Sequence, residues 1–188
     1  MLYLIVILAC SAIIILCNSL PMLAPELLLS NTIGVAVGVV AIIALDGIEA
    51  LVIRRLLPAS LFAPDKKAFR VTKKEHNFYN KLGIKHWKEK VPELGLFTGF
   101  DKGEIKSISE KDYLCRFLLE ANFGVAIHLA NAVLGFFILF IPFCSAPSIW
   151  IPIFAVNFVL NLMPVFILRY NTYILYRLYK RSQDHTKS

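Results

Sequence analysis

One apolar stretch carries a stripe of polar side chains whose residue types suit proton transfer. Glu120, Gly124, His128 and Asn131 stand at i, i+4, i+8 and i+11, which places them on one face of a helix. A neutral imidazole can take a proton from a hydroxyl group near neutral pH, and titratable side chains at membrane depth are candidates for function. His128 is therefore the candidate general base, and Glu120 lies about 12 Å further along the same helix.

Two other apolar stretches carry polar residues at helical spacing. Asp46 and Glu49 are three residues apart, and Asn157 and Asn161 are one turn apart. We expect a layer of carboxylates near Arg169 at the cytoplasmic side and a deeper layer that joins His128 to amides. The carboxylates are Asp46, Glu49 and Glu120, and the amides are Asn131, Asn157 and Asn161. For the amides, hydrogen bonds that only join membrane helices are the open alternative.

A basic, aromatic block, HNFYNKLGIKHWKEK, separates the apolar stretches. Thr72 and Glu75 have the spacing of a helix capping box, and Gly83 suits the left-handed end of the short helix that follows. In one interpretation the block lies on anionic lipid headgroups. In the other it also holds a phosphate-bearing or acyl-thioester donor. The residues concerned are His76, Tyr79, Lys81, Lys85, Trp87 and Lys88.

The elements that position these residues are membrane helices. The chain has 188 residues, of which 57% are apolar, and a mean hydropathy of +0.66, which is too apolar for a soluble domain of this size. We expect an all-α, polytopic bundle that forms one membrane domain over residues 1–188. The four predicted spans are about 1–23, 32–57, 117–141 and 149–168, with a loop at 58–116, which contains short interfacial helices, and a tail at 169–188.

Charge predicts the orientation of these spans. The segment from Arg54 to Arg116 holds 15 Lys or Arg against 8 Asp or Glu, while the two other links contain no Lys or Arg. Because basic loops stay on the cytoplasmic side, both termini and the central loop are predicted to be cytoplasmic. The first stretch is predicted to be a retained span and not a signal peptide. The cysteines have no metal-ligand spacing, so no metal site is predicted.

Three blocks of the sequence resemble the glycosyl-4,4'-diaponeurosporenoate acyltransferases, small bacterial membrane proteins of carotenoid glycolipid synthesis. The first block is His76, Phe78-Tyr79-Asn80-Lys81 and Lys85-His86-Trp87-Lys88. The second is the pair Glu120 and His128, and the third is Asn161, Pro164 and Arg169-Tyr170-Asn171. The chain differs from the family at three positions. It has Val125 where the family has a Glu, and it has Thr172 and Tyr173 where the family has basic residues.

The resemblance implies transfer of a fatty acyl group to a hydroxyl of a membrane glycolipid or related lipid in a bacterial cell membrane. The donor would be a co-substrate such as acyl-CoA or acyl carrier protein, with no bound cofactor and no metal. Glu120, paired with Arg169, would shape the cytoplasmic mouth, and Asn157 and Asn161 would bind sugar hydroxyls. The central block, with Asn80, Tyr170 and Asn171, would bind substrate.

Two other functions stay open at this point. One is a non-catalytic membrane scaffold or chaperone for a lipid-modifying enzyme, in which the polar stripe serves helix packing. The other is a small lipid transporter. The outer thirds of the last two spans are apolar, which counts against a transporter, because its polar residues would have to continue to the outer face. No nucleic-acid partner is expected, because a basic loop tethered to a membrane meets anionic lipid first. No oligomeric state is predicted.

Overall fold

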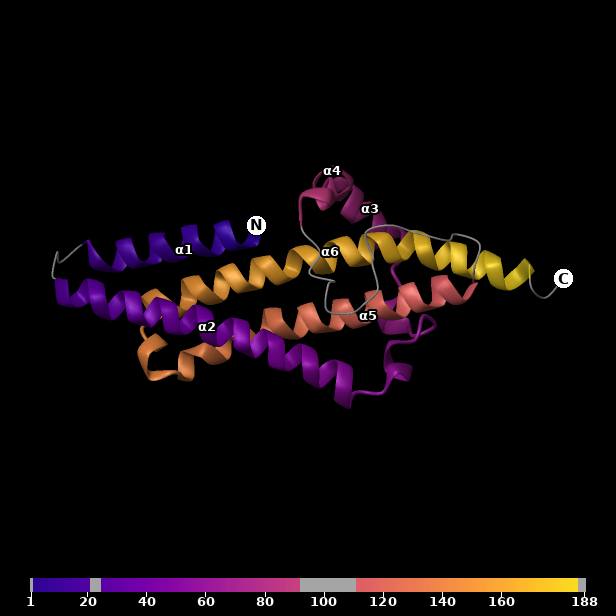
Figure 1. Ribbon diagram of the computed structural model, residues 1–188. Coiled ribbons are helices and arrows are strands. Elements are labelled where there is room, and N and C mark those ends of the chain that lie inside the picture. Colours follow the sequence, from indigo (N-terminus) through magenta and orange to yellow (C-terminus); the bar gives the residue numbers. More distant parts are fainter. Residues whose placement is uncertain (1, 21–24, 92–110, 186–188) are drawn as a thin grey trace. The chain divides into compact units, whose positions relative to one another are not determined.

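The computed structural model describes residues 2–20, 25–91 and 111–185, and every element in these ranges is a helix (Figure 1). Six are α-helices: α1 Leu2–Ser19, α2 Pro25–Leu56, α3 Lys73–Lys81, α4 Ile84–Trp87, α5 Lys111–Leu134 and α6 Pro147–His185. Short 3-10 helices connect them: η1 Ala59–Phe62, η2 Lys67–Phe69, η3 Lys88–Lys90, η5 Gly135–Phe140 and η6 Pro142–Cys144. The predicted all-α class is confirmed for this part of the chain.

Three helical stretches are long and apolar enough to cross a membrane: Leu27–Leu56, Lys111–Phe140 and Pro147–Gln183. At 1.5 Å per residue, each exceeds the ~30 Å of hydrocarbon in a bilayer. Their most apolar segments are only 17%, 44% and 33% buried within the protein, which leaves large aliphatic side chains exposed on their surfaces. The described residues therefore include three helices that can span a membrane. The predicted first span, about 1–23, corresponds to α1, which is apolar but has only 18 residues.

The helices extend beyond the predicted spans. Helix α2 begins at Pro25, a residue that suits the first turn because its missing N–H is not needed there. Helix α6 continues through the predicted tail to His185, because no Gly or Pro interrupts the chain between Arg169 and that residue. Pro164 lies inside α6 without ending it, as is common in membrane helices. Residues that the sequence predicts to be outside the membrane thus share a helix with the last span.

The chain forms two compact units, each built from separated segments. The first comprises Met1–Leu51 and Leu129–Leu162. Its core is aliphatic and consists of Ile14, Val35, Ile42, Ile138, Ile149 and Ile153. Cys144 is fully buried beside it and donates a hydrogen bond from Sγ to the Gly34 carbonyl, 3.3 Å away. Gly38 lets Ile153 approach α2 closely, since a Cβ on Gly38 would lie only 2.8 Å from Ile153 Cδ1.

The second unit comprises Val52–His128 and Met163–Ser188. Helix α5 packs on the C-terminal part of α6 through two apolar clusters, one made of Leu114, Phe117, Leu118 and Leu175 and the other of Ala121, Val125, Val165 and Leu168. Segment η1 is tied to α5 by Phe62, whose ring stacks 4.1 Å from Phe123 and whose carbonyl accepts a 2.8 Å hydrogen bond from Asn122. This unit holds the whole basic, aromatic block that the structure describes.

Candidate active site

Helix α3 begins at the predicted cap, but only half of the capping box forms. Thr72 has extended backbone angles and its hydroxyl accepts a 3.2 Å hydrogen bond from the Glu75 amide. Gly83 follows the helix with φ of 65°, the left-handed conformation that favours glycine, and α4 starts directly after it. The Glu75 carboxylate pairs with α6, and this contact fixes α3 against that helix.

Glu75 forms a two-point ion pair with Arg169. The guanidinium donates from Nε to Oε1 and from Nη2 to Oε2, the latter over 3.0 Å, and the Tyr79 hydroxyl donates to Oε1 over 2.7 Å. Burial alone would raise the pKa of Glu75, but the hydrogen bonds from Arg169 and Tyr79 and the arginine charge outweigh it and lower the pKa. Burial, together with the bond to Glu75, raises the pKa of Tyr79 to about 12. Glu75 is thus ionised and Tyr79 neutral near pH 7.

The predicted pair of Glu120 with Arg169 is wrong. Arg169 reaches Glu75 instead, and Glu120 accepts a 3.0 Å hydrogen bond from Arg54 at the end of α2. The Arg54 guanidinium also lies 5.4 Å from the Phe123 ring centroid. The two arginines therefore neutralise different carboxylates.

His76 is stacked on tyrosines of α6. Its ring centroid lies 4.9 Å from that of Tyr170 and 4.2 Å from that of Tyr173, with interplanar angles of 18° in both pairs. Its Nδ1 is buried and has no hydrogen-bond partner among the described residues. Burial lowers the pKa of His76, so the imidazole is neutral near pH 7.

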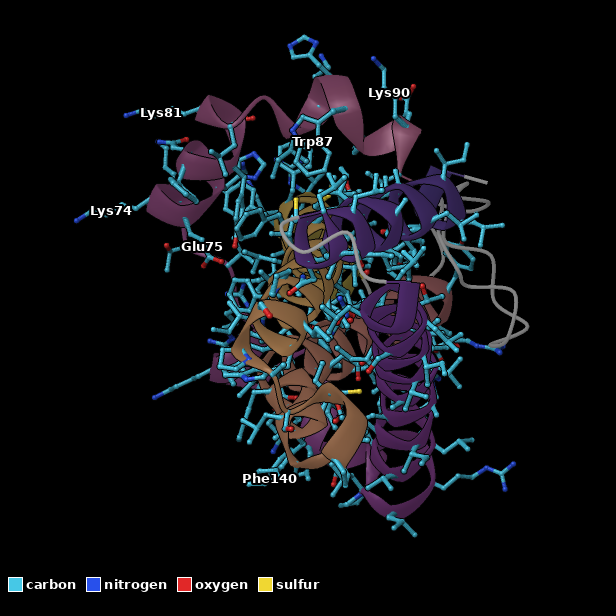
Figure 2. The ribbon with its side chains drawn as sticks, turned by 90° about the vertical axis from the view of Figure 1, so that its left-hand side faces the viewer. Lys74, Glu75, Lys81, Trp87, Lys90 and Phe140 are labelled. Atoms are coloured by element: carbon cyan, nitrogen blue, oxygen red, sulfur yellow. The ribbon has the colours of Figure 1, made fainter. Side chains whose placement is uncertain are left out.

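The basic block reaches α6 through only some of its predicted residues. Lys88 donates a 3.3 Å hydrogen bond to Asn171 Oδ1 and lies 5.6 Å from the Tyr170 ring centroid. Trp87 is half-buried and donates from its indole nitrogen to the Leu82 carbonyl, 3.1 Å away. The exposed side chains are those of Asn80, Lys81 and Lys85, and Figure 2 shows Lys81 extending outward from α3.

Six predicted residues therefore lie together on α3, η3 and α6. They are His76, Tyr79, Lys88, Arg169, Tyr170 and Asn171, and Glu75 binds two of them, Tyr79 and Arg169. The cluster combines stacked aromatic rings, a neutral imidazole, the Lys88 amine and the Arg169 guanidinium, which is paired with Glu75. It can hold an anionic or polar headgroup at the end of an apolar helix pair.

His128 and Glu120 lie on α5, with Gly124 between them, as their spacing predicts. His128 is half-buried, and Glu120 is held by Arg54. Val125, at the position where the family was expected to have a Glu, is only 2% exposed and packs among Ala121, Val165 and Leu168. That position belongs to an apolar cluster in this chain.

The amides of the first unit form a hydrogen-bond network. Asn161 Nδ2 donates to Asp46 Oδ2 over 3.2 Å and to Asn157 Oδ1 over 2.9 Å, and Asn157 Nδ2 donates to the Asn131 carbonyl over 3.0 Å. Asp46 therefore belongs to the same layer as the amides, so the predicted separation of a carboxylate layer from an amide layer is wrong. Glu49 is buried one turn along α2, with 8% of its surface exposed. These contacts support the packing interpretation of the amides.

A family model described as glycosyl-4,4'-diaponeurosporenoate acyltransferase matches residues 58–181, which is 124 of the 188 residues. The chain belongs to this acyltransferase family. No match was found in comparisons with curated proteins and with solved structures. The predicted family assignment is thereby confirmed.

The acyltransferase segment contains nearly every predicted site residue. It starts just before η1 and ends near the end of α6, so it includes His76, His128 and Arg169. Asp46 and Glu49 lie before it, as does Arg54, the partner of Glu120. The cluster around His76 and Arg169 is thus part of the family segment, whereas the two carboxylates of α2 are not.

Sequence reasoning missed Glu75 and Tyr173 as site residues. Glu75 was assigned entirely to the capping box, although only its backbone amide serves there. Tyr173 was treated as a departure from the family, yet its ring gives His76 its closer stacking contact. A usable signal was the series Arg169, Tyr170 and Tyr173, which places a cation and two aromatic rings at neighbouring positions of one helix. In the described part of the chain, no three His, Cys, Asp or Glu side chains gather as a metal site requires.

Proposed function

We propose that the protein is a membrane O-acyltransferase that moves a fatty acyl group from a thioester to a hydroxyl of a membrane glycolipid or related lipid. The observation that carries the proposal is the family match, which covers the cluster of His76, Lys88 and Arg169 on α3, η3 and α6. This cluster offers cations and aromatic faces to a donor headgroup. Acyl-CoA and acyl carrier protein are the donor types that such a site suits, and no bound cofactor is needed.

His128 is proposed as the general base. Its imidazole takes the proton from the acceptor hydroxyl while that oxygen attacks the thioester carbonyl carbon. The carbon–sulfur bond then breaks, and the thiolate leaves with the proton returned by the imidazolium, so the products are an ester and a thiol. General-base catalysis of this kind contributes about 100-fold to 10,000-fold in rate. Glu120 lies on the same helix, and its carboxylate is paired with Arg54.

The acceptor side is proposed to involve the first unit. Asn157 and Asn161 direct their amide hydrogens to protein oxygens, and Asp46 Oδ1 is buried without a hydrogen-bond partner among the described residues. A buried carboxylate oxygen in that state is costly unless a donor reaches it. A sugar hydroxyl is such a donor. Asp46 is thus proposed to accept a hydrogen bond from the acceptor lipid.

The proposed setting is a bacterial cell membrane, which the chain crosses several times. Both termini and the central loop are placed on the cytoplasmic side, where the basic residues attract anionic headgroups. Helix α1 is proposed as a fourth span beside the three longer ones. The second candidate is a scaffold for a lipid-modifying enzyme, which the internally bonded amides of the first unit favour.

Lipid extracts test the two functions against each other. Extracts of a bacterium that makes carotenoid glycolipids would be compared with and without the gene by mass spectrometry. The acyltransferase predicts that an unacylated glycolipid accumulates when the gene is absent, and that the wild-type protein restores the ester while the His128→Gln protein does not. Restoration by His128→Gln at the wild-type level would support the scaffold, because a scaffold needs no base.

A further inference from the structure

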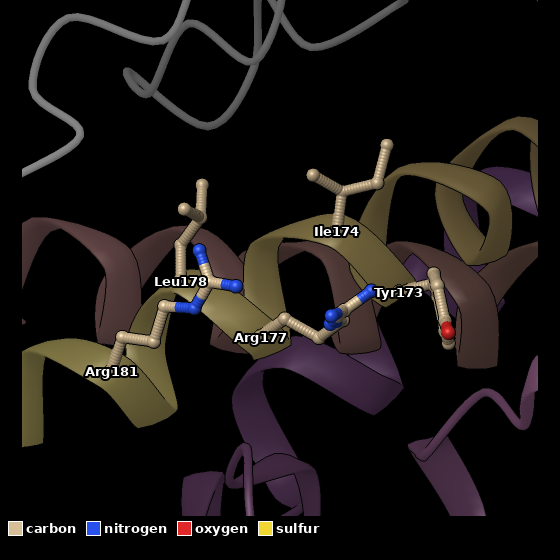
Figure 3. A pocket seen from close by; sticks show the side chains of 5 residues that line it. All are labelled: Tyr173, Ile174, Arg177, Leu178 and Arg181. Carbon is tan, nitrogen blue, oxygen red and sulfur yellow. The ribbon is translucent and has the colours of Figure 1, made fainter. Parts of the chain in front are cut away.

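A small pocket lies on the last turns of α6. Its lining comes from Tyr173, Ile174, Arg177, Leu178 and Arg181, and its volume is about 180 Å³ (Figure 3). Pockets that enclose a drug-sized ligand have about 300–1,000 Å³. This pocket therefore suits a headgroup or one phosphate with a few carbons. None of the roles proposed above uses Arg177 or Arg181.

The lining has two chemically different stripes. Tyr173, Arg177 and Arg181 follow one another at four-residue spacing, and Ile174 and Leu178 form the adjacent stripe. Figure 3 shows the two guanidinium groups beside the two aliphatic side chains. A ligand that contacts both stripes must carry an anionic group and an apolar part.

The cations of this pocket are available to a ligand. The Arg177 guanidinium lies 5.9 Å from the Tyr173 ring centroid, which restrains it beside another lining residue of the pocket. The ion pairs that Arg54 and Arg169 form do not involve Arg177 or Arg181, and both of these side chains are exposed. Guanidinium groups bind phosphate oxygens through paired N–H donors, and two such groups one turn apart can share one phosphate.

We propose that Arg177 and Arg181 bind the phosphate of an amphiphile whose apolar part lies against Ile174 and Leu178. Two sources supply this chemistry, a phospholipid of the surrounding bilayer and the phosphate-bearing thioester donor. If the ligand is the thioester donor, the inference rests on the proposed function and adds a subsite beyond the His76 cluster. If the ligand is a bilayer phospholipid, the inference is independent of catalysis.

Binding to the full chain in nanodiscs of neutral phosphatidylcholine tests the proposal. One arm measures the dissociation constant of a non-reactive thioether analogue of palmitoyl-CoA. The other adds phosphatidylglycerol and measures its retention on the protein by native mass spectrometry. The test variant is Arg177→Gln with Arg181→Gln. The matched control is Lys180→Gln, which removes one charge from the same turns at a residue whose amine lies over the Tyr176 ring, 5.8 Å from its centroid, and does not line the pocket.

We expect the double variant to weaken binding at least about tenfold in one or both arms, since it removes the paired N–H donors that bind phosphate oxygens. The control should change binding less than about twofold. Loss in the thioether arm assigns the site to the donor, and loss in the lipid arm assigns it to phospholipid. If neither arm changes, or if Lys180→Gln weakens binding as much as the double variant, the proposal is wrong. Binding needs no turnover, so this outcome is separate from failure of the acyltransferase itself.

Discussion

At the scale of single residues, the cluster on α3 depends on one carboxylate. Glu75 accepts two bonds from Arg169 and one from Tyr79, and its neighbour His76 stacks on Tyr170 and Tyr173. The side chains of Glu75 and Arg169 are 26% and 18% exposed, so solvent screens their pairing only in part. Removing one partner of such a pair leaves the other charge poorly compensated.

Glu75→Gln should therefore loosen α3 from α6. Hydrogen bonds to charged groups contribute about 1.5–3 kcal/mol, so we expect a loss of that order in the free energy of unfolding of this region. The measurement is thermal unfolding in detergent micelles, with amide hydrogen exchange of α3 as the local readout. The matched control is Glu89→Gln, an exposed carboxylate of η3. Equal melting temperatures and equal exchange in the two variants would contradict the anchoring role.

His76 should titrate below its ordinary pKa of 6.5, because burial disfavours the charged ring. The unfolded chain then takes up a proton before the folded one, so the contribution of His76 to stability is complete above pH 6.5 and is lost as pH falls through that value toward the folded pKa. NMR titration of the ring, assigned with His76→Gln, measures the midpoint. Tyr173→Leu should move it up toward 6.5. A wild-type midpoint at or above 6.5 would show that the ring is not buried against the tyrosines.

At the scale of elements, local patterns explain what could be predicted. Hydrophobic runs predicted the long helices, Thr72 predicted the start of α3, and Gly83 predicted the turn into α4. The pairing of Glu75 with Arg169 joins residues 94 positions apart. Arg169 binds Glu75 because α3 packs on α6. Spacing along one helix does not show which carboxylate of another helix an arginine meets, and for this reason the sequence pairs Glu120 with Arg169 and not with Arg54.

Two glycines of the first unit provide a matched test of the amide network. A Cβ on Gly135 would lie 2.6 Å from Asn157 Nδ2 and 3.2 Å from Ile42 Cδ1, whereas one on Gly47 would meet nothing within 4 Å. Gly135→Ala must displace the Asn157 amide from the Asn131 carbonyl, and overpacking of this kind costs about 1–3 kcal/mol. Gly47→Ala should leave the melting temperature unchanged or slightly raised. If Gly135→Ala is as stable as Gly47→Ala, the network does not hold these helices together.

At the scale of the whole molecule, charge and apolar length define the proposed topology. The segment from Arg54 to Arg116 has the same net charge of +7 as the whole chain, and three helices are long enough to span a bilayer. The span lengths could be predicted from composition because lipid imposes a minimum length on any crossing helix. The extension of α6 to His185 could not, because hydropathy falls at Arg169 while the helix continues.

Cysteine labelling tests this topology. Cys144 is buried and unsuited to the purpose, so single cysteines at the exposed positions Ser145 and Asn80 would be placed in a cysteine-free chain. An impermeant maleimide should reach position 145 in intact cells and position 80 only after lysis, because basic loops stay cytoplasmic. Labelling of position 80 in intact cells would contradict the proposed cytoplasmic location of the central loop.

The central claim is that this chain itself transfers an acyl group, and thiol release tests it most directly. Purified protein would be given acyl-CoA with and without an acceptor glycolipid, and free coenzyme A would be measured over time. The account predicts release that depends on the acceptor, loss of at least about 100-fold in rate with His128→Gln, and an unchanged rate with His86→Gln, an exposed imidazole on α4. No acceptor-dependent release by folded wild-type protein, or more than about a tenth of the wild-type rate in His128→Gln, would contradict it.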